Sequence, residues 1–248
     1  VDNNGVAYQT PRTAVFRYTD KKSGINSVLF SFEDHTNDEN FSDVVFTMTS
    51  NPVDAVTDIP SVDVNDGKKT ANVLRGIYAF EDLWPSRGDY DMNDVVVVVS
   101  VDRRSDKETG KVDLIRINWE LKAAGAAHLN AFAVQLDKVR ASEVAGVETT
   151  NTTFGRGAFA APGPESGSEL AVIPLFNTSQ EILGEGTYIN TTKGVAVPTV
   201  KHTTTVTFAQ PVDPAAVRES ALNAFIVVNQ KSSGTFTREK EIHMPGRM

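Results

Sequence analysis

The sequence predicts an all-β protein, an antiparallel β-sandwich of jelly-roll type with at most one or two short helices. Three observations lead to this prediction. Short runs of alternating or β-branched residues recur throughout the 248 residues, turn-forming residues separate these runs, and helical periodicity is nearly absent. Many short strands at close spacing are typical of sandwiches and jelly rolls.

The expected strands follow one another along the chain, with turns such as Asn51-Pro52, Asp66-Gly67 and Ser233-Gly234 between them. In order, the segments with strand patterns are Thr13–Tyr18, Ile25–Phe32, Val44–Thr49, Val73–Phe80, Val95–Val101, Val112–Lys122, Ala131–Leu136, Leu170–Ile173, His202–Phe208 and Ala224–Val228. The run of valines from Val95 to Val99 breaks the usual alternation. A continuous β-branched run predicts a strand that is buried on both faces or lies under a covering loop, and that is therefore central in its sheet.

One helix is expected near the C-terminal end. Asp213-Pro214 offers an N-cap followed by proline at the first helical position, so a helix of about two turns is predicted over Pro214–Leu222.

A passage rich in Pro, Asp and Thr divides the chain. We expect an N-terminal β segment at residues 1–52, a linker at residues 53–72, and a main sandwich domain at residues 73–248.

Charge and composition exclude several classes of protein. The net charge is −8 and no basic run occurs, which argues against a nucleic-acid partner. No apolar stretch approaches the ~20 residues that cross a bilayer, so no transmembrane segment is expected. The chain has no cysteine, which excludes disulfides, thiolate metal sites and cysteine nucleophiles. Its abundance of Thr, Ser, Asn, Asp and Val fits a secreted β protein.

The segment Phe80–Val99, FEDLWPSRGDYDMNDVVVVV, sets an acidic loop directly between two apolar strands. Carboxylates packed this closely at the end of a buried strand are costly unless a cation or backbone donors balance them. Calcium accepts six to eight oxygen ligands in irregular geometry, so we predict a calcium site here. Its candidate ligands are Glu81, Asp82, Asp89, Asp91, Asn93 and Asp94.

This loop is not an EF-hand, because Asp94 stands where the sixth-position glycine belongs and Ser100 where the bidentate glutamate belongs. The alternative is that the acidic residues make Asx-turns and cap strand ends without any metal.

A weaker copy of the motif lies upstream in Phe32–Phe46, FEDHTNDENFSDVVF. It shares Phe-Glu-Asp, a polar loop and Asp-Val-Val with the later segment, but it has fewer carboxylates. It predicts a weaker second metal site, with Asp34, Asp38, Asn40 and Asp43 as candidate ligands.

No catalytic motif occurs. The four histidines form no HExxH, and no GxSxG, Walker or GxGxxG string is present, so we expect no catalytic residue, no cofactor other than calcium, and a protein that is not an enzyme. Acidic pairs are common enough to leave a glycoside hydrolase as an alternative.

Two aromatic residues beside the acidic loop leave two interpretations open. Trp84 and Tyr90 are a possible platform for a sugar ring, which would make the chain a carbohydrate-binding module. The interpretation that we favour has Trp84 packed over the end of the sandwich, where it would cover the valine strand.

Four strings together resemble the LruC-domain family of bacterial, Bacteroides-type surface lipoproteins, over Val73–Met248. They are YAFEDLWPSRGDYDMNDVVV, WELKAAGAAHLNAFAVQL, NAFIVVN and EIHMPG. The six candidate ligands of the later loop match the acidic positions of the family pattern. Met92 departs from that pattern, and so does the Asn40–Asp43 string of the first copy.

The resemblance implies a β-rich, calcium-binding protein in cell adhesion or surface assembly, with an unidentified protein or glycan as its partner at the cell surface. It implies an extracellular or cell-surface location, with a lipid anchor on a segment outside this chain, and no established enzyme activity.

Overall fold

The structure is a computed structural model. It describes residues 13–19, 26–32, 44–49, 67–155, 157–160, 162–192, 196–229, 236, 238 and 240–246. The chain divides into two compact units, Val1–Asp66 and Gly67–Met248, and each is described by itself.

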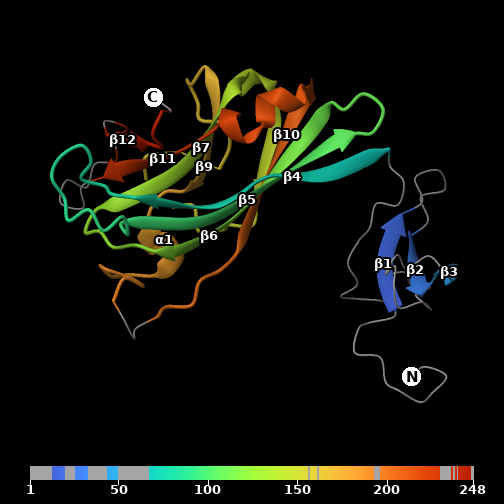
Figure 1. Ribbon diagram of the computed structural model, residues 1–248, viewed down its shortest axis with the longest axis horizontal. Helices are drawn as coiled ribbons and strands as arrows, with labels where there is room; N and C mark the ends of the chain where they lie inside the picture. Colours follow the sequence, from blue (N-terminus) through green and yellow to red (C-terminus); the bar gives the residue numbers. More distant parts are fainter. Residues whose placement is uncertain are drawn as a thin grey trace, which may run out of the picture. The chain divides into compact units, whose positions relative to one another are not determined.

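The first unit contains one antiparallel sheet of three strands in the order β1-β2-β3 (Figure 1). Its strands are β1 Thr13–Thr19, β2 Asn26–Phe32 and β3 Val44–Met48. Phe46 on β3 stacks on Phe30 and Phe32 of β2, with ring centroids 5.2 and 5.8 Å apart. The candidate ligands of the weaker metal site, Asp34, Asp38, Asn40 and Asp43, lie outside the described residues, so that site stays a prediction.

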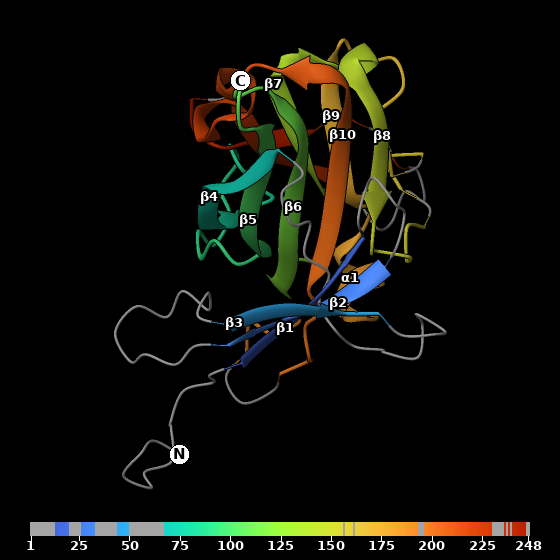
Figure 2. The ribbon, with the colours of Figure 1, turned by 90° about the vertical axis from the view of Figure 1, so that its right-hand side faces the viewer.

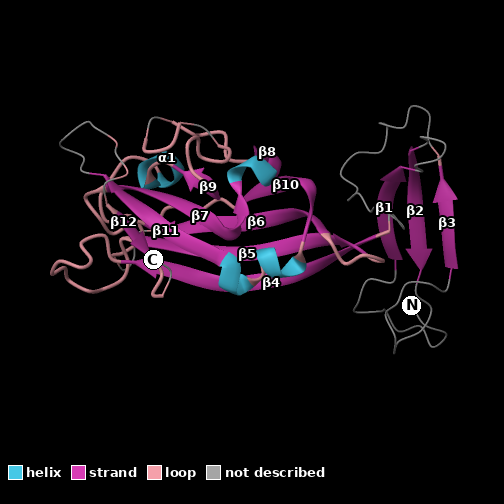
Figure 3. Cartoon of the chain, turned by 90° about the horizontal axis from the view of Figure 1, so that it is seen from above, coloured by secondary structure: helices cyan, strands magenta, loops and turns pink. Residues whose placement is uncertain are grey.

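The second unit is an antiparallel β-sandwich, which confirms the predicted all-β fold class (Figures 2 and 3). One sheet has the order β4-β5-β6-β10-β8, and the other has the order β12-β11-β7-β9. The strands of the first sheet are β4 Lys68–Phe80, β5 Val95–Asp106, β6 Val112–Ala123, β10 His202–Val212 and β8 Val144–Thr149. Those of the second are β12 Glu241–His243, β11 Leu222–Asn229, β7 Leu129–Arg140 and β9 Leu170–Phe176.

The main core lies between the two sheets. Val95, Val97 and Val99 of β5 point into it and pack in one cluster with residues of the opposite sheet such as Phe132 and Ile226. Every second residue of β5 is only half-buried, so the prediction of a strand buried on both faces is wrong. The reason is that no described element covers the outer face of this sheet. The prediction that this strand lies inside its sheet is confirmed, since β5 pairs with both β4 and β6.

The outer face of the four-stranded sheet is covered, in contrast. A second apolar cluster joins Phe159, from the segment between β8 and β9, to Val172 of β9 and to Phe225 and Val227 of β11. Asn177 holds this covering segment in place. Its Oδ1 accepts a hydrogen bond from the backbone N–H of Phe159 at 3.0 Å, and its Nδ2 donates to the Phe159 carbonyl at 2.9 Å.

The boundaries of several elements differ from those predicted. β4 begins at Lys68, so the last residues of the predicted linker belong to a strand, and the linker up to residue 66 lies outside the described residues. Lys68 and Lys69 carry no apolar pattern, yet they pair in register with Asp106 and Ser105 of β5. The strands β8 and β12 were not predicted at all. Both are short, with six residues in β8 and three in β12.

The predicted helix over Pro214–Leu222 is wrong in type. Two 3₁₀ helices, η3 Pro214–Val217 and η4 Glu219–Ala221, occupy this segment because Arg218 between them is extended (φ −73°, ψ 161°). The predicted N-cap is present, and Asp213 accepts a hydrogen bond from the N–H of Ala215 at 2.9 Å.

The remaining helical segments are α1 Ser179–Leu183 and the 3₁₀ helix η2 Ala141–Glu143. None of the helices in the described residues combines the length and the apolar character needed to cross a membrane.

Candidate metal centre

The acidic loop spans residues 81–94 and joins β4 to β5, which are neighbours in the five-stranded sheet. Phe80 ends β4, Val95 begins β5, and the two are directly paired and buried. The two ends of the loop therefore start from adjacent, rigid positions, which is where a precisely arranged site can be built.

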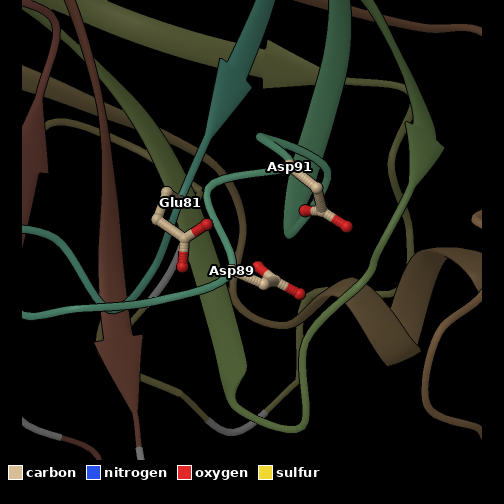
Figure 4. A group of neighbouring side chains, drawn as sticks. All are labelled: Glu81, Asp89 and Asp91. Atoms are coloured by element: carbon tan, nitrogen blue, oxygen red, sulfur yellow. The ribbon is translucent and has the colours of Figure 1, made fainter.

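An outer group of carboxylates is formed by Glu81, Asp89 and Asp91. One carboxylate oxygen of each residue lies within 4.8 Å of the other two (Figure 4). Two oxygens on opposite sides of a calcium ion are about 4.6–5.2 Å apart, which is twice the usual metal–oxygen distance. The spacing therefore admits one ion. Asp89 and Asp91 are exposed, so an ion can reach the group from solvent.

An inner group is formed by Glu81, Asp82 and Asp94, whose oxygens also lie within 4.8 Å of one another. These side chains are only 3%, 3% and 7% exposed. Asp82 Oδ2 accepts a hydrogen bond from Asn130 Nδ2 at 2.9 Å and lies 3.2 Å from His128 Nδ1. Asp94 Oδ2 accepts a hydrogen bond from the backbone N–H of Asp82 at 2.7 Å. The protein itself thus supplies donors to Asp82 and Asp94.

These donors do not fully balance the inner group. Burial, together with the negative charges of Asp82, Glu81 and Asp89, raises the pKa of Asp94 from 3.8 to about 7, against the lowering effect of the backbone hydrogen bond from Asp82. A carboxyl that holds its proton up to this pH lies in a place short of positive charge.

Glu81 belongs to both groups. Its Oε2 is buried and makes no hydrogen bond with any residue that the structure describes. The chain passes so close at Gly88 that a Cβ atom there would overlap the Glu81 carboxylate. Glycine at this position is therefore what lets the loop close over Glu81. A buried, unpartnered carboxylate oxygen is costly, and a cation would offset that cost.

Asn93, also a predicted ligand, helps to shape the loop. Its backbone N–H donates to Asp91 Oδ1 at 3.3 Å, and its side-chain amide donates to Asp91 Oδ2. This is the Asx-type turn that the alternative interpretation expects. The Asn93 carbonyl accepts a hydrogen bond from the N–H of Gly125 at 2.9 Å, which ties the loop to the connection between β6 and β7. A metal role for Asn93 stays a prediction.

A hollow of about 490 Å³ opens beside these residues. Four acidic residues line it, and its other lining residues include one arginine. The lining consists of Glu81, Asp82, Leu83, Arg87, Gly88, Asp89, Asp94, residues 125–128 and Tyr188. Its acidic lining comes from both carboxylate groups.

Trp84 and Tyr90 project from the same loop and are 56% and 55% exposed. The favoured interpretation, in which Trp84 covers the valine strand, is therefore wrong. The loop turns away from the core at this point, so the indole ring faces solvent. The sugar-platform interpretation stays a prediction.

Sequence reasoning missed three residues that contact Asp82. These are His128, Asn130 and Lys240, whose Nζ donates to the Asp82 carbonyl at 2.6 Å. They lie 46, 48 and 158 residues away along the chain, so no local spacing could identify them. The one signal was Asn130 itself, a polar residue at the start of an apolar strand.

Comparisons with known proteins give a family and a fold. Residues 110–248, more than half of the chain, match a family model described as "Domain of unknown function (DUF4842)". A search of curated proteins finds no match. The resemblance to the LruC-domain family stays a prediction.

Among solved structures, the chain is similar to the crystal structure of a protein from Bacteroides ovatus that is described as a "Putative lipoprotein". The two are 14% identical, with a TM-score of 0.51, and the likeness covers 94% of this chain and 69% of that one. At this identity the similarity shows the fold alone.

Proposed function

This chain belongs to the DUF4842 family, and on that premise we propose that it is a non-enzymatic cell-surface β-sandwich protein whose β4–β5 loop binds calcium as a structural clamp. One observation carries the calcium proposal. Glu81 is buried at the junction of two carboxylate groups, and one of its oxygens has no hydrogen-bond partner among the described residues. A divalent cation supplies the positive charge that such a cluster lacks.

The ion binds to the outer group, between Glu81, Asp89 and Asp91. The inner carboxylates of Asp82 and Asp94 already accept hydrogen bonds from the protein, whereas the outer ones face solvent. Three carboxylates leave further positions for loop carbonyls or water, as calcium sites with six to eight ligands require. The clamp would hold the end of β4 to the loop that leads into β5.

The surface role rests on two similarities. The Bacteroides ovatus protein of similar fold is described as a "Putative lipoprotein", and the strings quoted above resemble LruC-domain surface lipoproteins. We place the chain outside the cell, with a lipid anchor on a segment outside this sequence, in adhesion or surface assembly with a protein or glycan partner.

A second candidate function is carbohydrate binding at the tip of the same loop. The observation that favours it is the exposure of Trp84 and Tyr90, because exposed aromatic rings stack on the apolar faces of sugars. Binding on a glycan array that is lost in Trp84→Ala would support it. Binding unchanged by that substitution would remove it.

The calcium proposal is tested by metal content and thermal unfolding of the full chain, purified without chelator. Calcium at 100 times its dissociation constant adds about 2.7 kcal/mol to the free energy of unfolding, which is about 5–10 °C in melting temperature for a domain of this size. Asp91→Ala removes an exposed ligand, so we expect it to abolish most of this gain and to change the melting temperature little in EDTA.

Glu148→Ala is the matched control. Glu148 is an exposed carboxylate on β8, outside both carboxylate groups, so its removal should leave the calcium response intact. Equal losses for Asp91→Ala in calcium and in EDTA would mean that Asp91 only caps a turn. A wild-type protein that contains no calcium and shows no shift would reject the proposal.

A further inference from the structure

A second, larger hollow lies on the outer face of the five-stranded sheet, the face that no described element covers. Its volume is about 660 Å³. Residues of β5 and β6, among them Val98, form its floor, and β4 lines one side. The other side is the segment that enters β10, where Thr199 donates a hydrogen bond to Glu120 of β6. The hollow is therefore a groove that crosses the middle of the sheet.

A row of polar side chains crosses this groove on four adjacent strands. Asn72 of β4 donates to Asp102 Oδ1 of β5 at 2.9 Å, and Asn118 of β6 donates to Asp102 Oδ2 at 3.1 Å. Thr203 of β10 donates to Asn118 Oδ1 at 2.9 Å. These bonds fix the orientation of each side chain before any ligand arrives. Carboxylate and amide oxygens have two lone pairs each, so every acceptor in the row can still accept a ligand hydroxyl.

The charges in the groove balance one another. Arg75 and Lys201 contribute two positive charges, and Asp102 and Glu120 contribute two negative charges. Burial lowers the pKa of His202, so its ring is neutral at pH 7. Arg75 is exposed and has no hydrogen bond or ion pair with any residue that the structure describes, so its donors are available to a ligand.

We propose that this groove binds a neutral oligosaccharide. Sugar hydroxyls donate and accept hydrogen bonds, and the groove offers fixed acceptors in Asp102 and Asn118 beside free donors in Arg75. Val98 in the floor gives an apolar patch for the C–H face of a pyranose ring. A strongly anionic ligand is disfavoured, because the charges of the groove cancel and the whole chain carries −8. The site is distinct from the calcium loop and does not depend on it.

The test is an array of neutral and uronic-acid-containing oligosaccharides probed with the full chain, followed by isothermal titration of the neutral oligosaccharide retained most strongly. We expect neutral members to be retained. Arg75→Ala should weaken that binding at least about tenfold. It removes donors that make no hydrogen bond or ion pair with the described residues, so its effect on folding should be small.

Arg116→Ala is the matched control. Arg116 is exposed on β6, two residues from Asn118, and does not line the groove, so binding should stay within about twofold of wild type. Asp102→Asn, which keeps the shape of the side chain, should also weaken binding. Retention of uronic acids alone, retention of no sugar, or binding that falls with Trp84→Ala but not with Arg75→Ala would each overturn the proposal.

Discussion

Asp82 and Asp94 are buried and accept hydrogen bonds from the protein, whereas Asp89 and Asp91 are exposed on the same loop, a few residues away. The inner pair fastens the end of β4 to the start of β5 and to the start of β7. The outer pair makes few contacts that folding needs. Glu81 lies between them, buried like the first pair and without a donor for Oε2 among the described residues. The difference separates carboxylates that stabilise the fold from carboxylates that, in our proposal, bind calcium.

The largest expected effect on stability comes from removing one of the inner carboxylates. Asp82→Ala leaves the buried amide of Asn130 and the ring of His128 without their acceptor, so we expect a loss of about 3 kcal/mol in the free energy of unfolding. Urea unfolding in EDTA measures it. Asp82→Asn keeps an acceptor oxygen and should lose less.

Asp89→Ala is the outer counterpart, and in EDTA it should change stability by less than about 0.5 kcal/mol. A larger loss for Asp89→Ala than for Asp82→Ala would erase the distinction between the two groups.

The fold class was predictable because it depends on local pattern. The alternating and β-branched runs that predicted strands correspond to strands throughout the described residues. The predictions that failed include those of burial, which depends on what packs against each strand. Whether Val96 and Val98 are buried is decided by what covers the outer face of the sheet, and a valine run carries no information about that. The short helix α1 did have a signal, since Thr178 and Glu181 have capping-box spacing and Thr178 accepts the Glu181 N–H at 3.2 Å.

The sequence predicted which carboxylates lie together in the loop, but it did not predict how they are arranged in space. The spacing of the acidic residues in the loop identified all the carboxylates that the structure gathers there. It could not divide them into two groups, because that division depends on donors from β7 and from Lys240, far away along the chain. It also could not show that Asn93 donates to Asp91, since this depends on the curvature of the loop at Tyr90 and Met92, both with positive φ.

The pH dependence of the metal-free protein gives a second, smaller test of the inner group. The pKa of Asp94 is 3.8 when unfolded and about 7 when folded, so the folded state binds a proton more tightly. Stability from this group is therefore complete below pH 3.8 and is lost as the pH rises to about 7. Between about pH 5 and pH 7 the expected loss from this group is about 2 kcal/mol. Burial also raises the pKa of Glu181, so the loss assigned to Asp94 is the part of the pH dependence that an Asp94 substitution removes.

Unfolding in EDTA at several pH values measures this loss. Asp94→Asn, which stays neutral, should flatten the dependence between about pH 5 and pH 7. A wild-type protein that becomes more stable over that range would contradict the assignment, because it would mean that Asp94 is ionised in a balanced environment.

A smaller gain in stability is expected at Glu81, the residue that belongs to both carboxylate groups. Glu81→Gln removes a buried negative charge next to Asp94 while keeping the shape of the side chain, so in EDTA it should stabilise the protein by about 1 kcal/mol. The calcium-dependent gain in melting temperature should disappear at the same time. Glu120→Gln is the matched control, because Glu120 is also buried but accepts hydrogen bonds from Lys122 and Thr199. This substitution should destabilise the protein and keep the calcium response. A Glu81→Gln variant that still gains stability from calcium would move the ion away from Glu81, and the outer carboxylates would then be surface charges of the loop.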